Sequence, residues 1–148
     1  MSGLFIFLLV LAYFLIFWDS LSEHYISYTE ARSNELDAIT LADRLVMSGG
    51  QPLNWTQSPL SAKSIGLAKM PGELDSYRVD ALSSLPYANA KYLLGLDGDF
   101  LIKIDAQDGA VLALIGQQPG NTTRAIEVTR VALYNGNMVN VRVQLYEN

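Results

Sequence analysis

The stretch MSGLFIFLLVLAYFLIFWDS, residues 1–20, decides how this chain is interpreted. Residues 1–18 carry no charged side chain, and the first acidic residue is Asp19. A helix of that length extends about 27 Å, close to the roughly 30 Å thickness of a bilayer's hydrocarbon core. Burying one large apolar side chain is worth roughly 1.5–3 kcal/mol, and this stretch contains many of them. We therefore expect it to enter a membrane or a protein–protein core.

The helical pattern continues beyond Trp18 and changes character there. No glycine lies between Gly3 and Gly49, and no proline precedes Pro52. The apolar residues after Trp18 recur every three or four positions, which indicates an amphipathic helix. These residues are Leu21, Tyr25, Tyr28, Leu36, Ile39, Ala42 and Leu45. The sequence thus predicts one helix from about residue 2 to about residue 47, closed by two glycines and a proline.

The rest of the chain predicts a globular head with a C-terminal sheet. Four stretches with period-two alternation begin at Asp99, and Asp108-Gly109 and Asn135-Gly136 are hairpin-turn signals between them. The sides expected to face inward carry Phe100, Ile102, Ile104, Ile126, Val128, Val131, Val139, Val141, Val143 and Leu145. Two short helical patterns precede them, one starting near Pro71 and the other ending at Gly95.

These patterns define the expected fold class and the expected division of the chain. The fold class is α+β: a long N-terminal helix, hydrophobic and then amphipathic, packed on a small four-stranded antiparallel sheet. The hydrophobic helix segment covers residues 1–18, and its amphipathic continuation covers residues 19–48. The globular head covers residues 49–148.

Composition excludes several functional classes. The 148 residues have a net charge of −5, whereas nucleic-acid binding favours a basic face. The chain has no cysteine, which excludes disulfides and thiol catalysis. The sequence contains neither a nucleophile elbow nor a glycine-rich phosphate loop. We therefore expect no enzymatic activity and no cofactor.

Acidic side chains next to glycines offer a metal-site interpretation, which we do not favour. Asp97-Gly98-Asp99 and the pair Asp105 and Asp108 do not continue into a calcium-loop pattern, and turn formation explains the glycines. His24 has no second histidine or cysteine at ligand spacing. We therefore expect no metal site.

Two triplets match the acceptor pattern for N-glycosylation. They begin at Asn54 and Asn121, and both lie in expected loops. Because asparagine and threonine also suit turns, turn chemistry is the competing interpretation. Glycans would require both sites to lie outside the cytoplasm.

The overall layout resembles the archaeal type IV pilin-like proteins that carry class III signal peptides. The matching features are the charge-free start, the Trp18-Asp19-Ser20 boundary, and the segments GQPLNWT (residues 50–56) and GLAKMPGELD (residues 66–75). In that superfamily a basic leader is clipped before a long hydrophobic helix, and the mature helices pack in a filament core. One departure concerns registration: Phe5 stands where many pilins carry a glutamate.

The resemblance implies a structural subunit of an extracellular, cell-surface filament. Its expected partners are other copies of itself, the membrane before assembly, a leader peptidase and the pilus assembly machinery. The expected assembly residues are Phe5, Phe7, Leu9, Tyr13, Phe14, Phe17 and Trp18. The alternatives are a minor pilin and a single-pass membrane-anchored surface protein with a partner-binding head, in which these residues would contact lipid instead.

Overall fold

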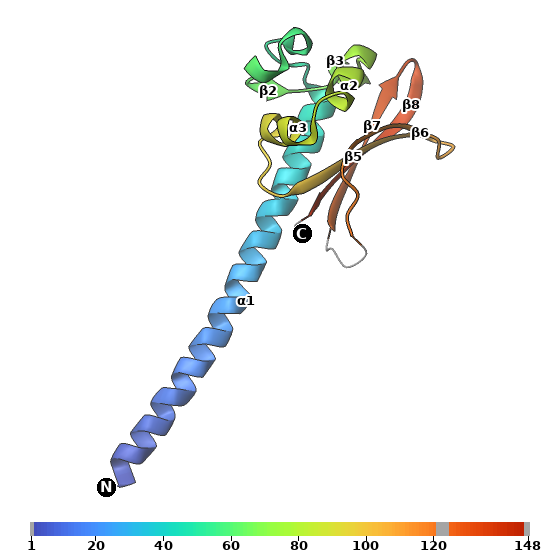
Figure 1. Ribbon diagram of the computed structural model, residues 1–148. Coiled ribbons are helices and arrows are strands. Elements are labelled where there is room, and N and C mark those ends of the chain that lie inside the picture. Colours follow the sequence, from blue (N-terminus) through green and yellow to red (C-terminus); the bar gives the residue numbers. More distant parts are fainter. Residues whose placement is uncertain (1, 121–124, 147–148) are drawn as a thin grey trace. The chain divides into compact units, whose positions relative to one another are not determined.

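The structure, a computed structural model, describes the backbone of residues 2–120 and 125–146 (Figure 1). Side chains are described over the same ranges except for residues 2–5 and 19–34. The chain divides into two compact units, Met1–Glu35 and Leu36–Asn148. Helix α1, Ser2–Met47, forms the described part of the first unit and contributes its last turns to the second.

The second unit contains a sheet and several short elements. The helices after α1 are η1 (Trp55–Gln57), η2 (Pro59–Ser61), α2 (Ser76–Ser83) and α3 (Tyr87–Leu94). The short strands are β1 (Gly50–Gln51), β2 (Ser64–Ile65), β3 (Ala68–Met70) and β4 (Glu73–Leu74). The longer strands are β5 (Asp99–Ala106), β6 (Val111–Gly116), β7 (Ala125–Tyr134) and β8 (Asn137–Tyr146).

The main sheet of the described residues is six-stranded and mixed, in the order β3-β4-β7-β8-β5-β6. Strand β4 pairs with β7 in parallel, through Glu73↔Leu133 and Leu74↔Tyr134, and the other neighbours are antiparallel. Figure 1 shows β5 and β6 curving strongly. Strands β1 and β2 form a separate two-stranded sheet.

The predicted fold class is therefore wrong. The sheet is neither small nor wholly antiparallel, and the fold is not the expected pilin-like lollipop. The two extra strands are only two and three residues long, so they give no period-two signal in the sequence. The start expected for the first short helix, near Pro71, is also wrong, because Glu73 and Leu74 pair with β7 and α2 starts only at Ser76.

The core of the second unit lies between the helices and one face of the sheet. Helix α1 contributes Ala38, Leu41, Ala42, Leu45 and Val46, all at most 4% exposed. The sheet contributes the alternate residues of β5 and β8, which are Phe100, Ile102, Ile104, Val139, Val141, Val143 and Leu145. These seven are the inward residues that the alternation predicts.

The expectation that Val131 faces inward is wrong. Its side chain is 56% exposed, while its neighbour Ala132 is 4% exposed and joins the core. The register explains the difference, because Val131 pairs with Asn140 on the outer face and Ala132 pairs with the buried Val139. Ile126 and Val128 are partly buried against the core, as predicted.

The end of α1 is fixed by a compact junction. Trp55 is fully buried, and its indole Nε1–H donates to the carbonyl oxygens of Gly49 at 3.0 Å and Gly66 at 3.3 Å. A Cβ on Gly66 would collide with the backbone oxygen of Ser48. Gly50 and Trp55 of the segment GQPLNWT and Gly66 of the segment GLAKMPGELD therefore meet at one place, where the chain leaves α1.

Candidate assembly surface

The apolar segment of α1, defined here as residues 6–18, exposes its side chains on every side. All of its residues are exposed, and none is charged. Its large apolar members range from Leu11, 44% exposed, to Tyr13, 72% exposed. A helix that is apolar all round is normally buried on all sides. This segment therefore needs a cover that the described residues do not supply.

Aromatic rings are paired along the apolar segment. Tyr13 stacks on Phe17 with ring centroids 6.4 Å apart, and Phe14 stacks on Trp18 at 6.0 Å. The spacing of four residues places each pair on one side of the helix. The four rings thus form two adjacent stacked pairs near the end of the apolar segment.

Six of the seven predicted assembly residues lie on this surface. Phe7, Leu9, Tyr13, Phe14, Phe17 and Trp18 are between 53% and 72% exposed. The Phe5 side chain lies outside the described side chains. Within the part of the chain that the structure describes, no helix combines the length and the apolar character that crossing a membrane requires.

The two predicted glycosylation sites have different outcomes. Asn54 is exposed at the N-cap of η1, and its side chain makes no capping hydrogen bond. Its amide is therefore accessible, while the next residue, Trp55, is fully buried. Asn121 lies outside the described residues.

Three aspartates of the acidic motifs make structural contacts. Asp99 accepts a hydrogen bond from the Tyr87 hydroxyl at 2.6 Å and pairs with Lys91 at 3.3 Å. Asp105 pairs with Arg142, and Asp108 Oδ1 accepts the backbone N–H of Ala110 at 3.0 Å.

Among the described residues, no group of three or more histidine, cysteine, aspartate or glutamate side chains could hold a metal ion. The side chain of His24 lies outside the described side chains.

Burial and hydrogen bonding shift the pKa of several groups in the second unit. Burial raises the pKa of Tyr87 to about 12, and its hydrogen bond to Asp99 adds to this effect. Burial also raises the pKa values of Tyr134 and Tyr146 above their usual range. On the surface, a hydrogen bond from Arg130 lowers the pKa of Asp43.

The sequence did not predict a pocket at the end of the sheet. A pocket lies between the turns of the β5–β6 and β7–β8 hairpins. The sequence identified both turns but assigned their side chains only to turn formation. The available signal was the gathering of amide and carboxylate side chains around them, at Gln107, Asp108, Asn135 and Asn137.

Comparison of the chain with protein-family models, with curated proteins and with solved structures finds no match.

Proposed function

We propose that this chain is a structural subunit that assembles with copies of itself, through the apolar segment of α1, into an extracellular filament of the type IV pilus kind. The observation that carries the proposal is the exposure of twelve large apolar side chains over residues 6–18, with no charge among them. The proposal rests on this segment and on the sequence features that resemble the pilin-like proteins, and not on the fold of the head.

If the apolar segment packs against the same segment of neighbouring subunits, its side chains are buried on all sides. Each subunit then buries its apolar segment among those of its neighbours, with roughly 1.5–3 kcal/mol for each large side chain. Contacts that join different faces of identical subunits are open-ended, so a single chain type can form a fibre. The stacked rings of Tyr13 and Phe17, and of Phe14 and Trp18, are suited to such packing because they bury large areas.

The proposal implies the partners of pilin-like proteins: a membrane, a leader peptidase and an assembly machinery. The apolar segment would reside in a membrane before assembly, and a leader peptidase and an assembly machinery would act on the chain. The accessible amide of Asn54 would then face the outside of the cell, where glycosylation is possible.

A single substitution in the apolar segment tests the proposal. Leu9→Glu places a carboxylate in the proposed helix core, and we expect sedimentable filaments to be lost because an unpaired buried charge is prohibitively costly. Leu60→Glu is the matched control, since Leu60 is also exposed, at 69%, but lies in η2. Filaments sheared from cells are pelleted, imaged by electron microscopy and identified by mass spectrometry.

Two outcomes would contradict the proposal. Normal filaments from the Leu9→Glu variant would show that residues 6–18 are not packed in the core. Wild-type chain found only in detergent-extracted membranes, never in sheared fibres, would favour the single-pass surface protein instead.

A further inference from the structure

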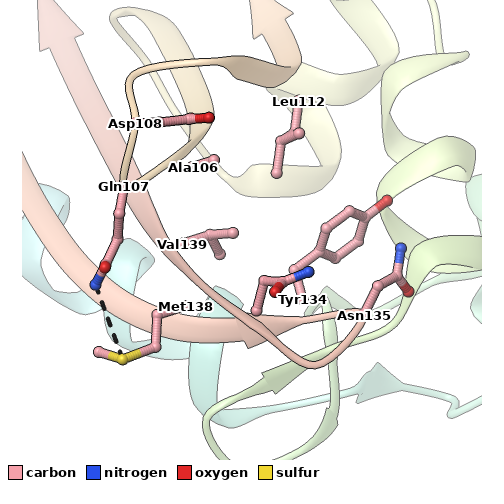
Figure 2. Close-up of a pocket in the computed structure, with 9 residues that line it drawn as sticks. Ala106, Gln107, Asp108, Leu112, Tyr134, Asn135, Met138 and Val139 are labelled. Atoms are coloured by element: carbon pink, nitrogen blue, oxygen red, sulfur yellow. Dashed lines mark hydrogen bonds between the residues drawn. The ribbon is translucent and has the colours of Figure 1, made fainter.

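The sheet topology brings two hairpin turns to the same place. Strand β5 pairs with β8 up to Ala106↔Val139, so the end of β5 lies beside the start of β8. The β5–β6 turn therefore lies next to the β7–β8 turn. Between them is a pocket of about 480 Å³ (Figure 2). Its lining residues are Ala106, Gln107, Asp108, Leu112, Tyr134, Asn135, Asn137, Met138 and Val139.

The pocket walls are held by the turns and do not need a ligand to form. In the first turn, the Ala106 N–H donates to the Ala110 carbonyl at 2.8 Å, and Asp108 accepts the Ala110 N–H at 3.0 Å. In the second turn, Asn135 and Gly136 have φ values of 52° and 81°, the left-handed geometry of a type I′ turn. A preformed pocket loses little conformational entropy when it binds a ligand.

The pocket combines an apolar floor with uncharged polar groups and one carboxylate. The floor is formed by Val139, which is fully buried, and Leu112, which is 47% exposed. Met138, 51% exposed, points to the other face of β8, where the Gln107 amide donates to its sulfur (Figure 2). Figure 2 shows Asp108 and Leu112 on one side of the pocket, and Tyr134 and Asn135 on the other. The polar groups are three side-chain amides, one carboxylate and a phenol. Each amide both donates and accepts hydrogen bonds.

The charges of the lining residues restrict which ligands can bind in the pocket. Asp108 is the charged side chain among the residues that line the pocket, which include no lysine, arginine or histidine. The pocket therefore repels anions and offers phosphate no cationic partner. A ligand that fits needs hydroxyl groups that donate and accept, an apolar face, and no negative charge.

We propose that this pocket binds a neutral sugar, with its hydroxyl groups on the amides and Asp108 and its apolar face on the floor and the Tyr134 ring. The volume lies within the roughly 300–1,000 Å³ of small-molecule sites. This activity goes beyond assembly, because residues 6–18 take no part in the pocket. It gives the head a recognition role whether or not the chain forms filaments.

The test uses the full chain in micelles of a detergent that has no sugar headgroup. Glucose, galactose, mannose and N-acetylglucosamine are titrated while saturation-transfer NMR records binding, and glucuronate serves as the charged comparison. We expect saturable binding of at least one neutral sugar. Glucuronate is expected to bind more weakly, because its carboxylate faces Asp108.

Two lining variants and one control variant test whether the sugar binds at the pocket. Asn137→Ala removes one lining amide and is expected to weaken binding at least about fivefold, the effect of one net hydrogen bond. Asn140→Ala, the same change three residues along β8 and outside the lining, should retain wild-type affinity. Gln107→Ala gives a second lining variant if Asn137→Ala disturbs the turn.

Three outcomes would overturn the proposal. The first is no saturable binding of any of the four neutral sugars. The second is unchanged affinity in both lining variants, which would put the binding elsewhere. The third is glucuronate binding as tightly as the neutral sugars. None of these results bears on filament formation, which the Leu9→Glu variant tests separately.

Discussion

Asp105 on β5 and Arg142 on β8 form an ion pair at 3.1 Å in which the carboxylate side chain is only 3% exposed. The arginine side chain is 38% exposed, so the pair is buried at one end only. Asp105 Oδ1 and Arg142 Nε have no hydrogen-bond partner among the described residues. The contact with Arg142 therefore offsets the cost of burying the charged Asp105 carboxylate.

Loss of Arg142 should destabilise the head measurably. In Arg142→Ala the Asp105 carboxylate stays buried without its partner, and we expect the free energy of unfolding to fall by about 2–3 kcal/mol. Arg130→Ala is the matched control, because its pair with Asp43 at 2.6 Å has side chains 35% and 53% exposed. An exposed pair contributes less than about 1 kcal/mol.

Denaturant titration of the full chain measures both changes. Trp55, fully buried in the head, reports unfolding when Trp18 of the apolar segment is replaced by phenylalanine. An equal effect of Arg142→Ala and Arg130→Ala would show that the Asp105 pair is no more important than a surface contact.

Gly66 should tolerate no side chain. Most glycines in the head have a positive φ, whereas Gly66 is restricted by a close backbone contact. A Cβ there meets the backbone oxygen of Ser48, which cannot move without displacing the end of α1. We expect Gly66→Ala to cost about 3 kcal/mol or more, as overpacking against backbone does. The same denaturant titration measures it.

Gly72→Ala is the comparison for Gly66→Ala. Gly72 has a φ of 83°, and a Cβ there would have open space around it. Its substitution should cost only the backbone strain of about 1–2 kcal/mol. If Gly66→Ala were the milder of the two, the tight junction around Trp55 would not be what fixes the end of α1.

Alternating apolar side chains located the longer strands, although burial itself alternates clearly only on β7 and most of β8. Phe100, Ile102 and Ile104 lie on one side of β5 and are fully buried, as period-two alternation requires. Asn135-Gly136 supplied the type I′ turn, and both residues have positive φ. These signals are local, so they can be read without knowledge of the fold.

Features that depend on distant partners could not be predicted. Strand β4 joins the main sheet because Glu73 and Leu74 pair with Leu133 and Tyr134, some sixty residues later, and β3 joins it only through β4. The pocket likewise forms only where two hairpins become neighbours, through Ala106↔Val139. The apolar segment could be predicted because its composition is uniform, whereas what covers it is not encoded in a local pattern.

The sheet register gives a prediction about Val131. Its side chain is 56% exposed, so Val131→Lys should change the free energy of unfolding by less than about 0.5 kcal/mol. The same substitution at Val141, which is fully buried, should prevent folding of the head because it buries an unpaired charge. Circular dichroism and denaturant titration distinguish the two results, and strong destabilisation by Val131→Lys would contradict the register.

Tyr87 should make the stability of the head depend on alkaline pH. Its hydroxyl donates to Asp99 at 2.6 Å, and its ring stacks on Phe100 with centroids 5.3 Å apart. Burial and the Asp99 contact raise the pKa of Tyr87 from 10.0 to about 12. The stabilisation that comes with this raised pKa is complete below the unfolded value and is lost as pH rises through the folded value.

We therefore expect the free energy of unfolding to fall between about pH 10 and pH 12, and Tyr87→Phe to reduce that fall. Denaturant titrations at a series of pH values measure it, and absorbance of the phenolate band shows a late-ionising tyrosine missing from the variant. Tyr92→Phe is the control, because that side chain is 78% exposed on the neighbouring part of α3. An identical pH dependence in wild type and Tyr87→Phe would show that the Tyr87–Asp99 contact does not resist ionisation, and the alkaline loss would then belong to Tyr134 or Tyr146.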